Sequence, residues 1–233
     1  MCDWTYLCHI GVQISIVAKK SNSMLEYIPM ETIVSIIIVL FSIILHEVAH
    51  GYAALALGDR TAQYAGRLTL NPIKHIDPFG TVMLPILMLI VTKGSFVFGW
   101  AKPVPYNPYN LRNQKWGDAI VALAGPLTNI SIAVLFAALL HIFAGASFMT
   151  QAFADMAVFV VFINMILACF NLVPIPPLDG SKVLFTFLPP QYMHIRHLLE
   201  RYSFIALLFF VFFLWDPFFV IVQFLVKLLL GTF

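Results

Sequence analysis

Residues 32–57 read TIVSIIIVLFSIILHEVAHGYAALAL, an apolar run that carries two histidines and a glutamate in its second half. A helix that crosses the hydrocarbon core of a bilayer needs about 20 predominantly apolar residues, so this run predicts a membrane-spanning helix. Ionisable side chains are costly at that depth and are usually functional there. The run therefore predicts a membrane protein and indicates where its site lies.

The composition of the whole chain agrees with this prediction. Of its 233 residues, 61% are hydrophobic and 10% are charged, and the mean hydropathy is +0.92. A soluble domain is nearer half apolar and a quarter charged. We therefore expect an all-α integral membrane protein in contact with the lipid bilayer. The net charge of +2 gives no support for a nucleic-acid partner, and three cysteines are too few for a disulfide framework.

Four further apolar runs cover residues 79–92, 117–143, 152–172 and 203–230. The second and third of these are long enough to span a bilayer. The run 79–92 is short and contains Pro85, which favours a re-entrant segment, with a fifth span as the alternative. Asp216-Pro217 interrupts the last run, so we expect a kinked span or two half-helices there. The predicted fold is a polytopic helical bundle of about 4–6 membrane segments, with a small strand or re-entrant element between its first two core helices.

These runs divide the chain into three parts. We expect residues 1–30 to form an N-terminal extension, residues 31–202 a membrane core, and residues 203–233 a C-terminal membrane helix or helical hairpin. The extension has no clear signal-peptide cleavage site, and Met24 or Met30 are alternative starts. Lys and Arg gather in residues 58–116 and 181–202. If the run 79–92 is re-entrant, the positive-inside rule places both regions on the cytoplasmic side, with the first span entering from outside. A spanning 79–92 also satisfies the rule, although slightly less well.

The chemistry of the first run lies in HEVAH, residues 46–50. On a helix, His46 and His50 are one turn apart and face the same way. Their ring nitrogens can then bind one Zn²⁺. Glu47 points close to the same place and can take a proton from a water molecule at the metal. The alternative is a chance match, in which the two histidines are satisfied core residues.

A catalytic zinc needs a third protein ligand and one open position. The metzincin pattern is absent, because Ala53 and Ala56 stand where it needs its glycine and third histidine. Glu200 is the only glutamate downstream of the motif, so the aspartates are the remaining candidates. Asp59 and Asp77 lie in polar loops with turn signals, where a solvated carboxylate is expected.

Asp179 is different, because it closes the stretch NLVPIPPLDG, residues 171–180. Three prolines in this stretch cannot continue a helix. Irregular backbone next to a membrane must be buried in protein or line a wet cavity. An aspartate in such a place is a good candidate for the third ligand, and we expect one zinc per chain.

At these residues the chain resembles the site-2 protease family of intramembrane metalloproteases. Three motifs carry the resemblance, in the family's order and spacing: HEVAH at 46–50, GPLTN at 125–129 and NLVPIPPLDG at 171–180. The likeness covers residues 31–190, extends to GRLTLNP (66–72), DPFG (77–80) and GWAKPVP (99–105), and is to the small prokaryotic branch without a PDZ domain.

The resemblance implies that His46, His50 and Asp179 bind zinc and that Glu47 is the catalytic base. It also implies that Asn171 helps to position the substrate carbonyl or its oxyanion. The expected function is hydrolysis of peptide bonds in or near transmembrane segments of protein substrates, by a multi-pass protein of a prokaryotic cell membrane. Asn129 is expected either to bridge two helices or to contact substrate.

Two other functions compete with proteolysis. A membrane metal-ion transporter usually has more spans and several intramembrane ligand sets, whereas this chain has one histidine pair and no internal repeat. A catalytically silent scaffold has no need of a base such as Glu47. Residues 65–70 are either a strand that holds an unwound substrate by strand addition or a simple surface loop.

Overall fold

A computed structural model describes residues 30–91, 101–144 and 150–231. The N-terminal extension, except for Met30, therefore lies outside the described residues, and so do the expectations about its start. Every regular element in the described residues is a helix. The fold is all-α, as predicted.

Four helices in the described part of the chain are long and apolar enough to cross a membrane, and they cover residues 32–56, 117–142, 151–171 and 203–230. The first three are α2 (Met30–Ala56), α5 (Gly117–Ile142) and α6 (Gln151–Asn171). The chain is a multi-pass integral membrane protein.

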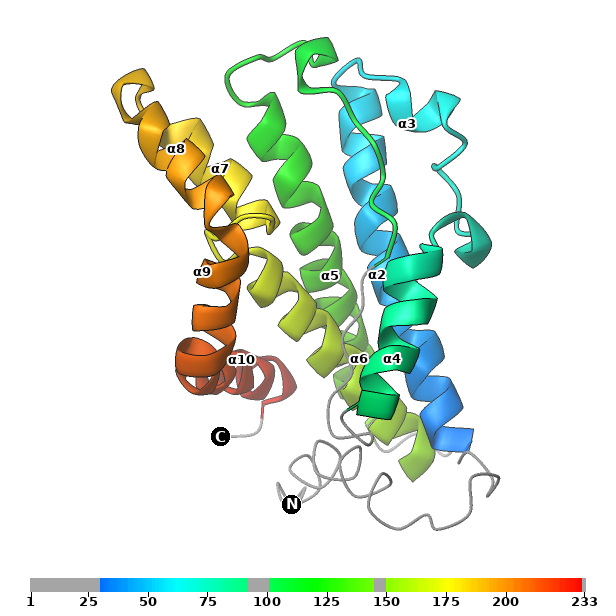
Figure 1. Cartoon of the computed structure of the whole chain (residues 1–233). Coiled ribbons are helices and arrows are strands. Elements are labelled where there is room, and N and C mark those ends of the chain that lie inside the picture. The colour runs from blue at the N-terminus through cyan, green and yellow to red at the C-terminus, as the bar shows by residue number, and fades with distance from the viewer. Residues whose placement is uncertain (1–29, 92–100, 145–149, 232–233) are drawn as a thin grey trace. The chain divides into compact units, whose positions relative to one another are not determined.

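The last stretch is not one regular helix. It consists of α9 (Ser203–Phe209), the π-helical turn η5 (Phe210–Leu214) and α10 (Trp215–Leu230). Leu214 leaves the helical conformation, with φ −111° and ψ 1°, and α10 turns away from α9 in Figure 1. Asp216 is exposed in the first turn of α10, where a negative charge is favourable. The two half-helices thus meet just before Asp216.

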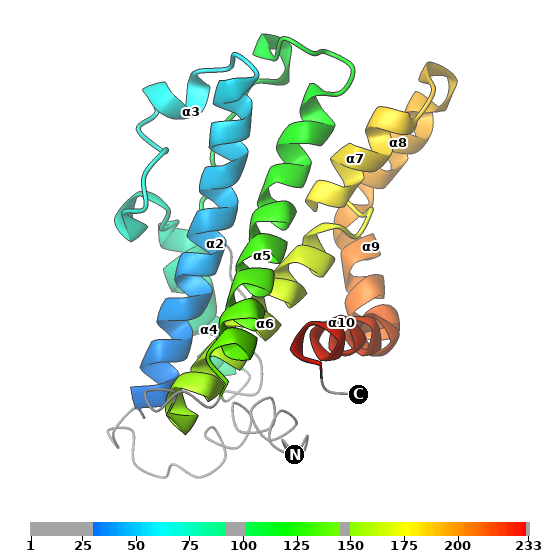
Figure 2. The same ribbon diagram turned by 180° about the vertical axis from the view of Figure 1, so that it is seen from behind.

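The chain forms two compact units, and the larger one comprises Ser35–Pro72 and Val104–Phe233. In this unit α5 packs against α6 and against α7 (Asp179–Phe187), and α10 packs against α6 and α5. Helix α2 runs alongside α5 in both views (Figure 1, Figure 2). Alanines on α5 allow close approach in the apolar core, which is built by Ala133, Ala137, Val161, Met165, Phe210, Phe218, Val222 and Val226.

Residues 65–70 form a loop after the short helix α3 (Thr61–Tyr64), so the alternative of a strand is wrong. The backbone nitrogens of Gly66 and Arg67 donate hydrogen bonds back to Gln63 and Ala62, each at 3.0 Å. Gly66 adopts a left-handed φ of 62°, which turns the chain out of the helix. These local bonds and turns replace the extended backbone of a strand.

The smaller unit contains Ile73–Pro103 and Met1–Val34. Within Ile73–Pro103 the longest helical part is η2 (Pro78–Met83), followed directly by α4 (Leu84–Val91). Asp77 caps η2, because its side chain accepts a hydrogen bond of 2.9 Å from the Gly80 nitrogen. Helices of six and eight residues rise together about 21 Å, short of a hydrocarbon core of about 30 Å. That this segment does not cross the membrane remains our prediction.

Candidate metal centre

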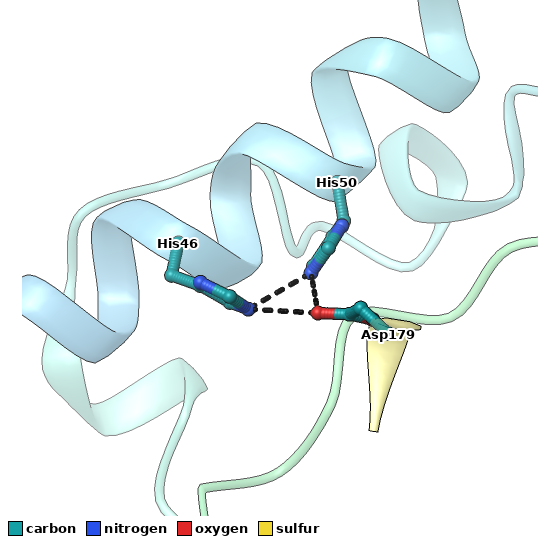
Figure 3. A group of neighbouring side chains, drawn as sticks. All are labelled: His46, His50 and Asp179. Atoms are coloured by element: carbon teal, nitrogen blue, oxygen red, sulfur yellow. Dashed lines mark hydrogen bonds and ion pairs between the residues drawn. The ribbon is translucent and has the colours of Figure 1, made fainter. Parts of the chain in front are cut away.

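The two histidines of HEVAH and Asp179 meet at one point (Figure 3). The Nε2 atoms of His46 and His50 are 3.0 Å apart, and Oδ2 of Asp179 lies 3.1 Å from each of them. All three residues are buried. The two histidines project from consecutive turns of α2, and Asp179 is the first residue of α7. The structure therefore brings together the three residues that the sequence proposed as ligands.

Hydrogen bonds to the other ring nitrogens fix the histidine tautomers. Nδ1 of His50 lies 2.7 Å from the carbonyl oxygen of Val121, and Nδ1 of His46 lies 2.6 Å from Oδ1 of Asn129. Since these oxygens only accept, each Nδ1 carries the hydrogen and each Nε2 presents a lone pair. Histidines that bind metals usually donate their second N–H in this way.

Three acceptor atoms therefore face one another at 3.0–3.1 Å. Such atoms repel unless a cation lies between them. Their separations approach the roughly 3.3 Å expected between ligands of a tetrahedral zinc with bonds of about 2.0–2.1 Å. These side chains could hold one zinc ion with a fourth position open. In the described residues no other group of three His, Cys, Asp or Glu side chains is arranged to hold a metal.

The electrostatics of Asp179 also suit a cation. Burial by itself would raise the pKa of its carboxyl group. Hydrogen-bond contacts with His46 and His50, together with the charge of Lys182, outweigh burial and lower that pKa below its ordinary value. The Lys182 ammonium lies 3.4 Å from Oδ1, the oxygen that does not face the histidines.

Glycines allow two backbone segments to approach the site. A Cβ atom on Gly125 would lie 2.5 Å from Nε2 of His50 and 2.6 Å from Nε2 of His46, so only glycine lets α5 pack against both rings. A Cβ atom on Gly180 would lie 2.6 Å from the carbonyl oxygen of Val173. Gly180 thus allows the chain after α6 to fold tightly over the start of α7, where Asp179 is placed.

Asn129 bridges helices beside the site. Its Oδ1 accepts from His46, and its Nδ2 donates a hydrogen bond of 2.8 Å to Oδ1 of Asn164 on α6. Nδ2 of Asn164 in turn donates to Oγ of Ser42 at 2.9 Å. All of these side chains are buried. The structure favours the bridging role of Asn129 over direct contact with substrate.

Asn164 and Ser42 were not among the residues predicted from the sequence. A polar side chain in the middle of the apolar run 152–172 was the available signal for Asn164, because such residues in a span usually have a function or a polar partner. Ser42 stands one helical turn before His46, on the same face of α2.

Glu47 is half-buried and is not among the three converging side chains. Its Oε2 accepts a hydrogen bond of 2.9 Å from the backbone nitrogen of Val104. The residues after Val104 are tied to the end of α2, because the Arg112 nitrogen donates to the Leu57 carbonyl at 2.8 Å. The base candidate is thus oriented by a backbone segment that is itself anchored.

Asp59 anchors the same segment, and the expectation of a solvated carboxylate is wrong. Its side chain is fully buried and accepts from the Asn107 nitrogen at 2.7 Å, from Asn110 Nδ2 at 2.9 Å and from Thr61 Oγ1 at 2.6 Å. Burial alone would raise the pKa of Asp59, but the hydrogen bonds from Thr61, Asn110 and Asn107 lower it. Asp59 is structural and lies outside the metal group.

The chain is similar in sequence to a known family of proteins. The sequence model of peptidase family M50 matches residues 34–156 and 139–214. The chain belongs to peptidase family M50. YwhC of Bacillus subtilis is 36% identical over 189 residues, which cover 78% of this chain and 82% of that protein. Rip2 of Mycolicibacterium smegmatis is 34% identical over 160 residues, covering 65% of this chain and 56% of that protein.

A third relative, MJ0611 of Methanocaldococcus jannaschii, is 33% identical over 155 residues, covering 65% of this chain and 69% of that protein. All three relatives carry the words zinc metalloprotease in their names. No solved structure matches the chain with significance. This member of family M50 is a zinc metalloprotease with Zn²⁺ as its cofactor. Its bacterial and archaeal relatives agree with a prokaryotic cell membrane.

Asn171 is the last residue of α6 in this M50 peptidase. Its Nδ2 donates a hydrogen bond of 2.9 Å to the carbonyl oxygen of Leu167, one turn earlier. The amide is therefore bonded to its own helix and not to the three converging side chains.

Two cavities of about 400 Å³ each lie in the larger unit of the M50 peptidase. One is an apolar groove, which we call the α2 groove, and it is lined by Leu45, Val48, Ala49, Tyr52, Leu68, Thr69, Leu70 and Thr128. The other has both charged and apolar side chains in its lining, among them residues that precede and follow Asp179 in the chain. Its lining includes Tyr106, Asp118, Pro177, Ser181, Lys182 and Arg196.

Proposed function

We propose that this M50 peptidase hydrolyses peptide bonds in or beside transmembrane segments of membrane-protein substrates, at a zinc ion bound by His46, His50 and Asp179. The depth of the site along α2 carries this proposal. About 21 Å of apolar helix precede His46 and about 15 Å follow it as far as Ala56. A site at that position in a spanning helix lies within the hydrocarbon core of about 30 Å.

Zinc, when bound, supplies Lewis acidity that makes a water molecule a better nucleophile and polarises the substrate carbonyl. Glu47 accepts the proton of the attacking water. Two observations support this role: Glu47 is adjacent to His46 on the helix but outside the ligand group, and the Val104 nitrogen holds its carboxylate in place. The Asn171 amide donates to the developing oxyanion, after it has left the Leu167 carbonyl.

The α2 groove is the proposed binding site of the substrate. Its lining includes Val48 and Ala49, the two residues between Glu47 and His50, so a substrate bound there lies along the HEVAH motif. Its lining is mostly apolar, as a transmembrane segment requires. Residues 68–70 on its other wall are not helical and can offer backbone groups to an extended chain. The other cavity has charged side chains in its lining, including Lys182 in contact with Asp179, and gives water a separate approach.

The structure offers less support to the other two functions. A transporter needs further ligand sets along a path, whereas the described residues contain one such group. A silent scaffold gives no reason for a carboxylate held beside the metal group but outside it.

Reconstitution of the full chain with a transmembrane peptide tests the proposal. We expect one zinc per chain, cleavage inside or next to the apolar segment, loss of cleavage with a chelator, and recovery on addition of zinc. His46→Ala should lose both zinc and cleavage. His141→Ala is the matched control, because this histidine also lies in a span but bonds to the Ala137 carbonyl at 2.7 Å. Zinc uptake into the liposomes without peptide cleavage would favour a transporter.

A further inference from the structure

The buried amides beside the metal centre form a continuous chain from the backbone of α6 to His46. Nδ2 of Asn164 donates to the carbonyl oxygen of Val160 at 2.9 Å and to Ser42 Oγ at 2.9 Å. Oδ1 of Asn164 accepts from Asn129, and Oδ1 of Asn129 accepts from His46. Asn129 and Asn164 are both 0% exposed, so water does not compete for these groups.

The donor-to-acceptor direction of these hydrogen bonds is fixed by the carbonyl oxygen of Val160. A backbone carbonyl only accepts, so the end of the Asn164 amide that faces Val160 must be its NH₂ group. The oxygen of Asn164 must then face Asn129, and the NH₂ group of Asn129 must face Asn164. The oxygen of Asn129 is left for His46, whose Nδ1 therefore carries the hydrogen.

Turning the Asn129 amide over would place a hydrogen atom on the nitrogen of His46 that faces the metal site. If the Asn129 amide turned over, its NH₂ group would face Nδ1 of His46, which would have to accept. A neutral imidazole with an accepting Nδ1 carries its hydrogen on Nε2, the atom that faces His50 and Asp179. The turn would also bring two oxygens together between Asn129 and Asn164, or between Asn164 and Val160 if both amides turned.

We propose that Asn164 is a positioning residue for zinc: anchored on the Val160 carbonyl, it holds the Asn129 amide in the orientation that leaves Nε2 of His46 free to bind the metal. His50 needs no orienting amide, because its Nδ1 donates directly to the carbonyl oxygen of Val121. The tautomer of His50 is thus set directly by a backbone carbonyl. The tautomer of His46 is set by a backbone carbonyl that acts through the amides of Asn164 and Asn129. The inference rests on the zinc ligands proposed above.

Zinc affinity, measured on the detergent-solubilised full chain by competition with a coloured chelator, tests the inference without an activity assay. Asn164→Leu should weaken zinc binding about tenfold or more, the usual cost of losing an outer partner of a histidine ligand. Asn164→Asp should stay within about threefold of the parent, because an aspartate at 164 accepts from Asn129 whether it is ionised or protonated, and so keeps its orientation. A loss in Asn164→Asp as large as that in Asn164→Leu overturns the inference.

A test in an Asn129→Asp variant distinguishes whether Asn164 orients the Asn129 side chain or only fills space. In Asn129→Asp both outer atoms are oxygens, so turning the side chain changes nothing for His46. Adding Asn164→Leu to this background should change zinc affinity by less than about threefold. An equal loss in both backgrounds would show that Asn164 only fills space, and no loss in the parent background would also overturn the inference.

Two controls complete the experiment. Ser42→Ala removes a buried hydroxyl from the same chain but leaves the Val160 carbonyl, so affinity should stay within about threefold, and a tenfold loss would contradict anchoring on Val160. His46→Ala tests the zinc assignment itself. If His46→Ala keeps zinc, the proposed ligands are wrong. If it loses zinc while Asn164→Leu binds normally, only the role of Asn164 is wrong.

Discussion

The backbone N–H of Val104 donates a hydrogen bond of 2.9 Å to Oε2 of Glu47, 57 residues earlier in the chain. This contact joins α2 to the segment that leads into α5. The backbone holds one carboxylate oxygen of the proposed base, and the role proposed for Glu47 requires the other oxygen to take a proton. The contact also explains why glutamine is the informative substitute at this position.

We predict that Glu47→Gln keeps zinc and loses peptide hydrolysis by at least about 10²-fold, the usual contribution of a general base. The glutamine oxygen can still accept from Val104, but an amide cannot take a proton from water. Zinc content and peptide cleavage should be measured on the same preparation. Glu47→Ala is the companion variant, which loses the Val104 contact as well and should unfold at a lower temperature than Glu47→Gln. Hydrolysis near the parent rate in Glu47→Gln would refute the assigned base.

Gly125→Ala should lose zinc although it adds only one methyl group. That methyl group would lie 2.5–2.6 Å from both Nε2 atoms, so the rings or α5 must shift. We expect an affinity loss of about tenfold or more, as for other changes next to ligating histidines. Gly117→Ala is the control on the same helix, because its methyl group would meet only the Leu111 side chain, at 3.0 Å. Zinc affinity unchanged in Gly125→Ala would show that the two helices separate freely.

Asp59→Asn should lower stability at neutral pH by on the order of 1–3 kcal/mol, because the new NH₂ group faces donors where a carboxylate oxygen accepted. The folded-state pKa of Asp59 lies below its ordinary 3.8, so its stabilisation is complete above that pH and is lost as the pH falls through the folded-state value. Thermal unfolding should therefore separate parent and variant at pH 7, and the difference should shrink in acid. Asp155→Asn, whose carboxylate is exposed, should show neither effect. A constant difference at all pH values would contradict this account.

His46, His50 and Asp179 could be predicted as a metal-binding group because local sequence patterns govern where they lie. The spacing of His46 and His50 follows from helix geometry, and the prolines before Asp179 exclude a regular helix there. The amide chain beyond Asn129 could not be predicted in the same way. Its contacts depend on how α5 and α6 are rotated against each other, and a single sequence does not encode that register in any local pattern.

Burial of Asp59 was missed for a related reason. Its neighbours Gly58 and Arg60 are typical of an exposed turn, but its partners Asn107 and Asn110 arrive from a distant loop. The break before α10 was located to within two residues, because Asp216-Pro217 marks it locally. Residues 65–70 have the alternation of a strand, but hydrogen bonds back to α3 hold them as a loop.

We predict that residues 79–92 do not cross the membrane. Single cysteines placed in residues 60–75 and 102–115 of a cysteine-free chain should react with an impermeant maleimide from the same side. A cysteine at Ile142, at the far end of α5, should react from the opposite side. Labelling of 60–75 and 102–115 from opposite sides would instead require a fifth span.

We predict that the substrate helix must unwind before it is cleaved. A peptide bond in an intact helix has its carbonyl already bonded and its neighbours packed around it. The substrate must therefore unwind before water and metal can reach the bond. Helix-breaking residues near the cleaved bond should speed hydrolysis, and residues that strengthen the helix should slow it.

Asn171→Ala tests how the unwound segment is held. The amide stands where α6 ends and the irregular stretch to Asp179 begins, and its bond to the Leu167 carbonyl is one that a substrate oxyanion can replace. Loss of such a donor typically lowers kcat by about 10²–10³-fold. Zinc affinity should not change, since Asn171 has no contact with the ligand group, and Thr128→Val in the α2 groove should change KM more than kcat. If Asn171→Ala leaves kcat unaltered and a stronger substrate helix is cut at the same rate, this account of substrate handling is wrong, while the zinc ligands stand on their own geometry.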